Sequence, residues 1–168
     1  IKNGMMLGMG NNKFDPHGTT SRAMIVTILY RLEGEPTISG KNPFVDVKNG
    51  TWYTDAVIWA EENGIVDGYG EGKFGPDDAI TREQLAAIML RYAVYKGMDA
   101  LTMEENLHFD DASEISEYAV SAMNWAAKSP EQNLRSGAAN WERSRAWYWL
   151  KEPAKLEAAD PANSSVWW

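Results

Sequence analysis

A repeat with one fixed offset constrains this chain more than any other feature of its sequence. Residues 64–91 hold a glycine that can end a helix, a glycine-rich loop closed by Phe-x-Pro, and a helix that opens on Thr-Arg. Phe14 and Phe74 stand 60 residues apart. At the same offset the chain repeats Asn3-Gly4 as Asn63-Gly64, Gly8 as Gly68, Gly10 as Gly70, Lys13 as Lys73, Pro16 as Pro76, Arg22 as Arg82, Ile28 as Ile88 and Arg31 as Arg91. So many identities at one unbroken offset predict a repeat protein.

The helix that follows each loop has a well-defined start. Thr81 is a favourable N-cap, because its hydroxyl can accept a hydrogen bond from an N–H of the first turn. Gln84 stands at the third helical position and can bond back to the cap, which completes a capping box. In the first unit Ser21 replaces the cap and Met24 replaces the glutamine. We therefore expect a helix after each cap, and we expect the first unit to lack the reciprocal half of the box.

Apolar residues at helical spacing predict helices throughout, and hence an all-α fold. Behind the two caps the spacing is carried by Ile25, Ile28, Leu29 and Leu32, and by Leu85, Ile88, Met89, Tyr92 and Tyr95. An earlier helix, ended by Gly64, carries Tyr53, Ala56, Trp59 and Ala60 on one face. Tyr118, Ala122, Trp125 and Ala126 repeat that face after the insertion of one residue. We expect Trp59 and Trp125 to lie in the core.

The order of these features divides the chain into units. It predicts the back half of a first unit at 1–33, a linker at 34–43, a complete second unit at 44–93, a second linker at 94–108, and the front half of a third unit at 109–128. Residues 129–168 lack a glycine-rich loop and hold five of the eight tryptophans. They are a diverged third unit or a tail outside the repeat, and a change of reading frame near residue 129 is one hypothesis. Because repeat units cannot bury their apolar faces alone, we expect a marginally stable or partly open fold.

Composition excludes several classes of function. The net charge of −8 argues against a general nucleic-acid or anionic-membrane surface. The chain has no cysteine, so it has neither disulfides nor cysteine metal sites. No apolar run is long enough to cross a bilayer. Because the chain opens on Ile1 in the middle of a repeat, we expect it to be a fragment of a longer protein.

The motifs together resemble the S-layer homology (SLH) domain. They are Phe-x-Asp, Trp-Tyr, Ala-x-x-Trp-Ala, Gly-Ile-Val-x-Gly, Gly-x-Phe-x-Pro and Ile-Thr-Arg-Glu-Gln. The family's signature is Thr-Arg-Ala-Glu at the start of the second helix. This chain departs from the signature. The first unit has Met24 in place of the acid, and the second has Glu83 in place of alanine and Gln84 in place of the acid. No third copy of the motif is recognisable. The resemblance implies three helix–loop–helix repeats in a pseudo-threefold spindle.

The resemblance also implies a function outside the cell. Such domains attach extracellular proteins non-covalently to the bacterial cell wall, usually by binding a secondary cell-wall polysaccharide, often pyruvylated, in grooves between repeats. The signature arginine contacts the acidic group, which implies this role for Arg22 and Arg82. A helix start offers free N–H groups to such a carboxylate, and an arginine can bind it with two hydrogen bonds. The candidate ligand-binding residues are therefore Arg22, Arg82, Thr81, Ser21, Trp52, Gly68 and Gly70.

Other interpretations stay open. The two arginines could instead form structural ion pairs with a neighbouring repeat. The chain could be a protein–protein assembly module of a surface layer, or it could bind peptidoglycan directly. Acids at Asp67, Glu71 and Asp78 only weakly fit a calcium loop, because Tyr69 stands where an oxygen ligand is needed. The two histidines and the scattered carboxylates form no catalytic signature, so we expect no catalytic residue, metal or cofactor.

Overall fold

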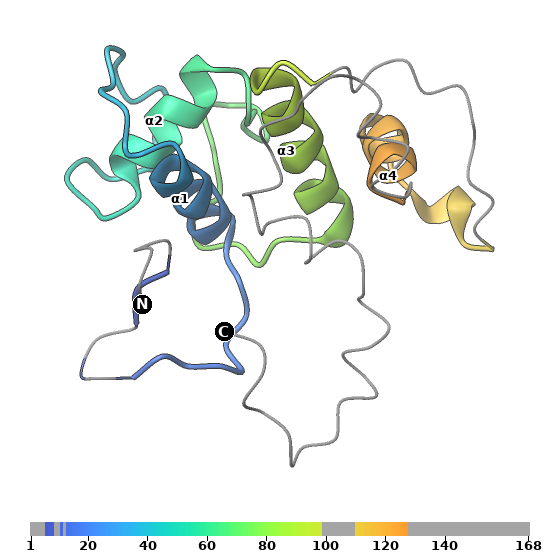
Figure 1. Cartoon of the computed structure of the whole chain (residues 1–168), viewed down its shortest axis with the longest axis horizontal. Coiled ribbons are helices and arrows are strands. Elements are labelled where there is room, and N and C mark those ends of the chain that lie inside the picture. The colour runs from blue at the N-terminus through green and yellow to red at the C-terminus, as the bar shows by residue number, and fades with distance from the viewer. Residues whose placement is uncertain (1–5, 9–10, 12, 99–109, 128–168) are drawn as a thin grey trace.

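A computed structural model describes residues 6–8, 11, 13–98 and 110–127. The described part is helical, and its β-structure is limited to isolated bridges with no strand, which confirms the predicted all-α class (Figure 1). None of its helices is long and apolar enough to cross a membrane. The elements are α1 (Arg22–Leu32), α2 (Thr54–Glu62), α3 (Arg82–Tyr95), the short 3-10 helices η1 (Ala112–Glu114) and η2 (Glu117–Ala119), and α4 (Val120–Ala127).

Both predicted helix caps are present, but the expectation for the first unit is wrong in one respect. Thr81 accepts from the backbone N–H of Gln84, and the Gln84 side chain accepts from the N–H of Thr81, each at 3.3 Å. In α1, Ser21 Oγ accepts from the N–H of Met24 at 3.3 Å. The thioether sulfur of Met24 accepts from the N–H of Ser21 at 3.5 Å, so the box closes there too. Sulfur is a weak acceptor, yet its reach suffices where no carboxylate is available.

The helix ends depend on glycines with positive φ. α2 ends at Glu62 and is followed by Gly64 with φ 65°, as the sequence predicts. α3 continues to Tyr95, two residues into the predicted linker, and Gly97 follows with φ 75°. These residues adopt the left-handed conformation without the steric penalty of a Cβ.

One core joins the units. α1 packs against α2, and α3 packs against α4. Trp59 and Trp125 are each 2% exposed, which confirms that both are core residues. Tyr118 does not lie on the core face as expected, since it is 55% exposed while Ala119 is fully buried. Tyr118 therefore corresponds to the exposed Trp52, and the inserted residue lies before it.

Asp46 fastens the front half of the second unit to its glycine-rich loop. Its two carboxylate oxygens accept from the backbone N–H groups of Phe74 and Gly75, each at 2.8 Å. The Phe44 and Phe74 rings pack 5.4 Å apart beside this contact. The Phe-x-Asp motif thus binds the Phe-x-Pro motif, which lies about thirty residues later in the chain. One aromatic pair and one carboxylate that accepts two hydrogen bonds make this contact.

These bonds change the acidity of Asp46. Burial acts to raise its pKa, but the N–H groups of Phe74 and Gly75 favour the charged form and lower the pKa overall. A carboxyl whose folded-state pKa is depressed stabilises the fold above its unfolded pKa of about 3.9. That stability is lost as the pH falls through the lower, folded-state pKa.

We predict that Asp46→Asn lowers the free energy of unfolding by about 1–3 kcal/mol at pH 7, because a neutral amide cannot accept equally from both N–H groups. The deficit relative to the unmodified chain should begin to shrink below about pH 4, where the unfolded chain takes up a proton at Asp46, and should vanish as the pH falls through the lower, folded-state pKa. Urea unfolding followed by far-UV circular dichroism at pH 7 and pH 3 measures both effects.

Asp111 provides a matched control. It stands in the corresponding Phe-Asp-Asp motif of the third unit, is exposed, and makes no capping hydrogen bond through its side chain. Asp111→Asn should change stability by less than about 0.5 kcal/mol. Equal losses in the two variants would contradict the role assigned to Asp46.

Candidate functional site

The start of α1 is seated on the loop of the following unit, residues 67–80. The backbone N–H of Arg22 donates to the carbonyl of Asp78 at 3.0 Å, and that of Ala23 donates to the carbonyl of Pro76 at 3.1 Å. The N–H of Ile80 donates in the opposite direction, to the carbonyl of Thr20 at 3.1 Å. A β-bridge between Ser21 and Ala79 lies within this ladder. The free N–H groups of the helix start are thus satisfied by carbonyls of the next unit.

The side chain of Arg22 completes this contact. Its Nε donates to the carbonyl of Phe74 at 2.9 Å, and its Nη2 donates to the carbonyl of Asp67 at 3.0 Å. The guanidinium carbon lies 4.5 Å from the centre of the Tyr69 ring and 4.8 Å from that of Phe74. Arg22 is only 5% exposed. Burial lowers its pKa, while Tyr69 and Asp78 act in the opposite direction, and an arginine remains charged in any case.

Gly68 and Gly70 shape the loop that receives Arg22. A Cβ on Gly68 would lie 2.5 Å from the carbonyl oxygen of Lys73 and 2.8 Å from the Phe44 ring, so only glycine fits. Gly70 has φ 91° and bridges to Lys73. Both residues therefore form the loop that α1 contacts, and Gly70 leaves open space where a side chain would be.

The start of α3 is open where that of α1 is covered. Thr81 and Arg82 are exposed. Within the described part of the chain, the Arg82 side chain has neither a hydrogen bond nor an ion pair, and the backbone N–H groups of Arg82 and Glu83 have no acceptor. Arg22 and Arg82 thus have opposite environments although they stand at equivalent sequence positions. The loop of the second unit covers Arg22, and no described loop covers Arg82.

Two exposed tyrosines lie close to the open helix start. Tyr69 is 51% exposed, and its hydroxyl accepts from Gln84 Nε2 at 3.4 Å. Tyr118 donates to Glu83 at 3.1 Å, beside the backbone N–H and hydroxyl of Ser116, which also donate to Glu83. These bonds lower the pKa of Glu83, with the backbone N–H of Ser116 as the main cause. Burial, followed by the bond to Glu83, raises the pKa of Tyr118.

The structure brings most of the sequence-predicted residues together. The ladder joins Ser21 and Arg22 to the loop that holds Gly68 and Gly70, and this loop leads directly into Thr81 and Arg82. Trp52 is 56% exposed and packs edge-on against Tyr53, and no described contact links it to this group. The sequence analysis missed Tyr69 and Tyr118 as site residues. Two signals in the sequence could have indicated them. Tyr69 stands between Gly68 and Gly70, and Tyr118 occupies the position that corresponds to Trp52.

A second arginine borders the loop. Arg91 Nη2 lies 2.6 Å from Asp67 Oδ2, while the Asp67 carbonyl accepts from Arg22. Burial is the main cause of the lowered pKa of Arg22, and the positive charge of Arg91 lowers it slightly further. Asp67 thus contacts two arginines, Arg91 through its carboxylate and Arg22 through its backbone carbonyl. Among the described residues, no cluster of acids or histidines could hold a metal ion.

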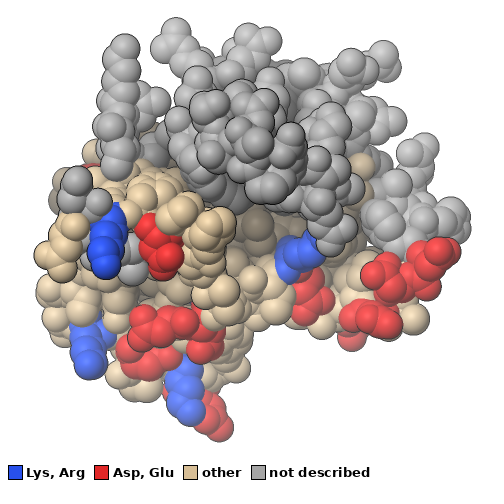
Figure 2. Space-filling view, turned by 90° about the horizontal axis from the view of Figure 1, so that it is seen from below, with Lys and Arg blue, Asp and Glu red and all other residues tan. Residues whose placement is uncertain are grey.

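On the face seen in Figure 2, the basic side chains are scattered singly and several lie beside acids. Acids gather at both ends of this face, including the end that holds residues 110–117. Recognition of an anion would therefore depend on short-range contacts at one place, because exposed charges are screened over about 10 Å at ordinary ionic strength.

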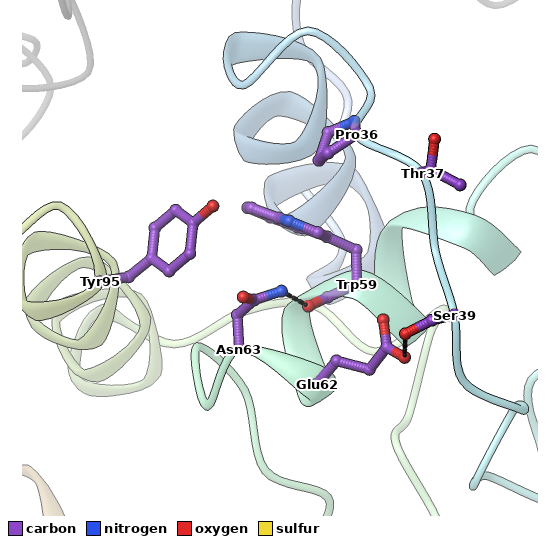
Figure 3. Close-up of a pocket in the computed structure, with 7 residues that line it drawn as sticks. All are labelled: Pro36, Thr37, Ser39, Trp59, Glu62, Asn63 and Tyr95. Carbon is purple, nitrogen blue, oxygen red and sulfur yellow. Dashed lines mark hydrogen bonds between the residues drawn. The ribbon is translucent and has the colours of Figure 1, made fainter.

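A hollow of ≈ 470 Å³ lies elsewhere, at the C-terminal ends of the helices (Figure 3). Pro36, Trp59, Asn63 and Tyr95 help to line it, and Ser39 bonds to Glu62 at its rim. Trp59 packs edge-on against Tyr95 and is almost fully buried, so the tryptophan serves the core. None of the sequence-predicted site residues lines this hollow. We place the candidate site at the start of α3.

Comparison with known proteins agrees with this architecture. Residues 43–86 match the model of the S-layer homology domain. The chain is 33% identical over 124 residues to the exoglucanase XynX of Acetivibrio thermocellus, covering 72% of this chain and 11% of that protein. It is 32% identical over 138 residues to the surface-layer 125 kDa protein of Lysinibacillus sphaericus, covering 77% of this chain and 11% of that protein.

A third relative, the cellulosome-anchoring protein of Acetivibrio thermocellus, is 26% identical over 140 residues, which are 78% of this chain and 31% of that protein. The chain thus spans a small part of the relatives it matches, and the enzymes among them are similar to it only over a minor share of their length. The similarity expected from the motifs is confirmed, and the chain carries an S-layer homology domain, matched at residues 43–86.

Proposed function

We propose that this chain anchors an extracellular protein non-covalently to the bacterial cell wall, as a non-catalytic module at the cell surface. The family match supports this role, and so do relatives named as a surface-layer protein and as a cellulosome-anchoring protein. Enzymes of different activities share this segment over 6–11% of their length, which is consistent with an appended module.

The ligand we propose is the acidic, pyruvylated secondary cell-wall polysaccharide. The observation that carries this proposal is the unpaired Arg82 at the exposed first turn of α3. A ketal carboxylate could bind the guanidinium through two hydrogen bonds and also accept from the free N–H groups of the first turn. The nearby Tyr69 ring, half exposed and held by Gln84, offers an apolar face to a sugar ring.

Arg22 has a different role in this proposal. Two of the five guanidinium N–H groups donate to loop carbonyls, and the side chain is almost fully buried. We assign it to positioning: it holds the loop so that Tyr69 stands next to the start of α3. We retain Gly68, Gly70 and Ser21 as residues that shape this loop contact.

We predict that Arg82→Ala weakens binding to purified, protein-free walls roughly tenfold to a hundredfold, since a hydrogen bond to a charged group contributes about 1.5–3 kcal/mol. The affinity of Arg82→Lys should lie between that of the unmodified chain and that of Arg82→Ala, because lysine keeps the charge but lacks the planar guanidinium that can form two parallel hydrogen bonds. Lys41→Ala, at an exposed linker position, is the control and should bind normally. Cosedimentation with walls measures the dissociation constants.

Walls from which the polysaccharide has been chemically removed complete this experiment. Binding that survives the removal would identify peptidoglycan as the ligand and contradict the proposed polymer. Absence of binding to either wall would contradict anchoring and favour the alternative of an assembly module.

We predict that Arg22→Lys lowers the free energy of unfolding by about 1–3 kcal/mol, because lysine cannot reach both loop carbonyls and leaves buried acceptors unpaired. The identical substitution at the exposed position, Arg82→Lys, should change stability by less than about 0.5 kcal/mol. Urea denaturation of both variants measures the difference. Similar stability of the two variants would exclude the positioning role of Arg22.

A further inference from the structure

The hollow at the C-terminal ends of the helices is a second place where this chain could hold a ligand. Three of its lining residues lie in the linker between the first two units, three lie on α2 or directly after it, and Tyr95 lies on α3. None comes from the first or the third unit. Its volume of ≈ 470 Å³ is within the range of about 300–1,000 Å³ that is usual for ligand pockets.

Trp59 brings an unpaired donor to the wall of this hollow. The residue is 2% exposed, and its indole N–H has no acceptor in the part of the chain that the structure describes. In Figure 3 the indole ring extends from α2 toward Tyr95, and Asn63 and Glu62 lie along the same side of it. Buried donors without an acceptor are rare and costly. An acceptor atom of a ligand in the hollow would remove that cost.

The other polar groups that line the hollow are mainly acceptors. Ser39 Oγ donates to one carboxylate oxygen of Glu62 at 3.1 Å, and Asn63 Nδ2 donates to the backbone carbonyl of Trp59 at 2.7 Å. The second oxygen of Glu62 and the side-chain oxygen of Asn63 accept no hydrogen bond from any described residue. No lysine, arginine or histidine is among the described residues that line the hollow. The hollow therefore suits a ligand that brings several donors.

Negative charge surrounds this end of the molecule. α2 ends at Glu62, and the C-terminal end of a helix carries a partial negative charge. The Tyr30 ring lies 5.6 Å from that of Trp59, and the pKa of Tyr30 is raised, mainly by burial and next by the negative charge of Asp55. Neither Asp55 nor Glu62 has a basic partner among the described residues, while the bases near the ends of α1 and α3 are themselves paired with glutamates. A cationic donor is therefore favoured over a neutral one.

We propose that this hollow binds an amino sugar, a hydroxylated ring that carries a protonated amine. The ammonium group donates to Glu62 and lies close to the ring of Tyr95, whose π electrons attract a cation. One sugar hydroxyl oxygen accepts from the indole N–H of Trp59, and another hydroxyl donates to the side-chain oxygen of Asn63. A single sugar ring thus satisfies the unpaired donor and both unpaired acceptors.

This site is separate from the candidate site at the start of α3. Arg82 and Tyr95 stand at opposite ends of that helix, which is about 20 Å long. The two sites also differ in sign, because the start of α3 offers donors to an anion, whereas the hollow offers acceptors to a cation. Binding of a free amino sugar is therefore independent of wall anchoring, and either can fail without the other.

Titration of the isotope-labelled full chain with glucosamine, followed by two-dimensional NMR, tests this site directly. We predict that the assigned indole N–H signal of Trp59 shifts to saturation, with a dissociation constant on the order of 1 mM. Glucose has a hydroxyl in place of the amine, so it should bind roughly tenfold more weakly through the loss of one hydrogen bond to a charged group. Methylammonium, which has the charge without the hydroxylated ring, should also bind more weakly.

Two outcomes of this titration would overturn the proposal. The first is the absence of a saturable shift of the Trp59 signal at glucosamine concentrations well above the expected dissociation constant. The second is equal affinity for glucosamine and for either glucose or methylammonium, because the hollow would then recognise hydroxyl groups alone or any cation.

Glu62→Gln and Glu61→Gln provide a matched pair of variants. Each removes one negative charge from the exposed end of α2, but only Glu62 lines the hollow. We expect Glu62→Gln to weaken glucosamine binding roughly tenfold, because the ammonium group loses its charged acceptor. Glu61→Gln should change the dissociation constant less than about twofold, since solvent and salt screen exposed charges. Equal losses in the two variants would mean that general charge attracts the amine, and would rule out recognition by the hollow.

Discussion

The structure depends on one interaction between units: the first turn of a helix in one unit donates its free N–H groups to the carbonyls of a glycine-rich loop in the next. Helix starts leave N–H groups without intrahelical partners, and burying them unpaired is costly. In α1 the partners are Asp78 and Pro76, and the Arg22 side chain adds two more carbonyl contacts. This contact positions the loop that carries Tyr69.

The same interaction explains why the loop is rich in glycine. The glycines allow residues 68–73 to fold back tightly, which places the Phe74 carbonyl and the residues after it against the start of α1. Gly68 allows the close approach of Lys73, and Gly70 adopts a positive φ. Asp46 then ties the loop to its own unit through the N–H groups of Phe74 and Gly75. The loop thus donates to Asp46 of its own unit, and its Pro76 and Asp78 carbonyls accept from the start of α1, so backbone groups of the loop link the two units.

Much of the fold was predictable from local patterns. The caps at Ser21 and Thr81, the glycine after α2, and the burial of Trp59 and Trp125 follow from spacing and side-chain chemistry. Two expectations failed because they depend on geometry that residue type does not encode. Met24 closes a capping box with its sulfur. Tyr118 is exposed because the inserted residue shifts the register before it.

The sequence alone determined the repeat, the helical class and the family, because these depend on periodic patterns and on motifs a few residues long. It also identified both arginines as candidates, but it could not distinguish between them. Only the tertiary structure showed that Arg22 is buried against Phe74 and Asp67 while Arg82 is exposed. The physical reason is that the groups around Arg22 come from a loop 45–52 residues away in the sequence, which a local motif does not encode. An offset of 60 residues makes the two helix starts equivalent, but the neighbouring loop decides which of them is covered.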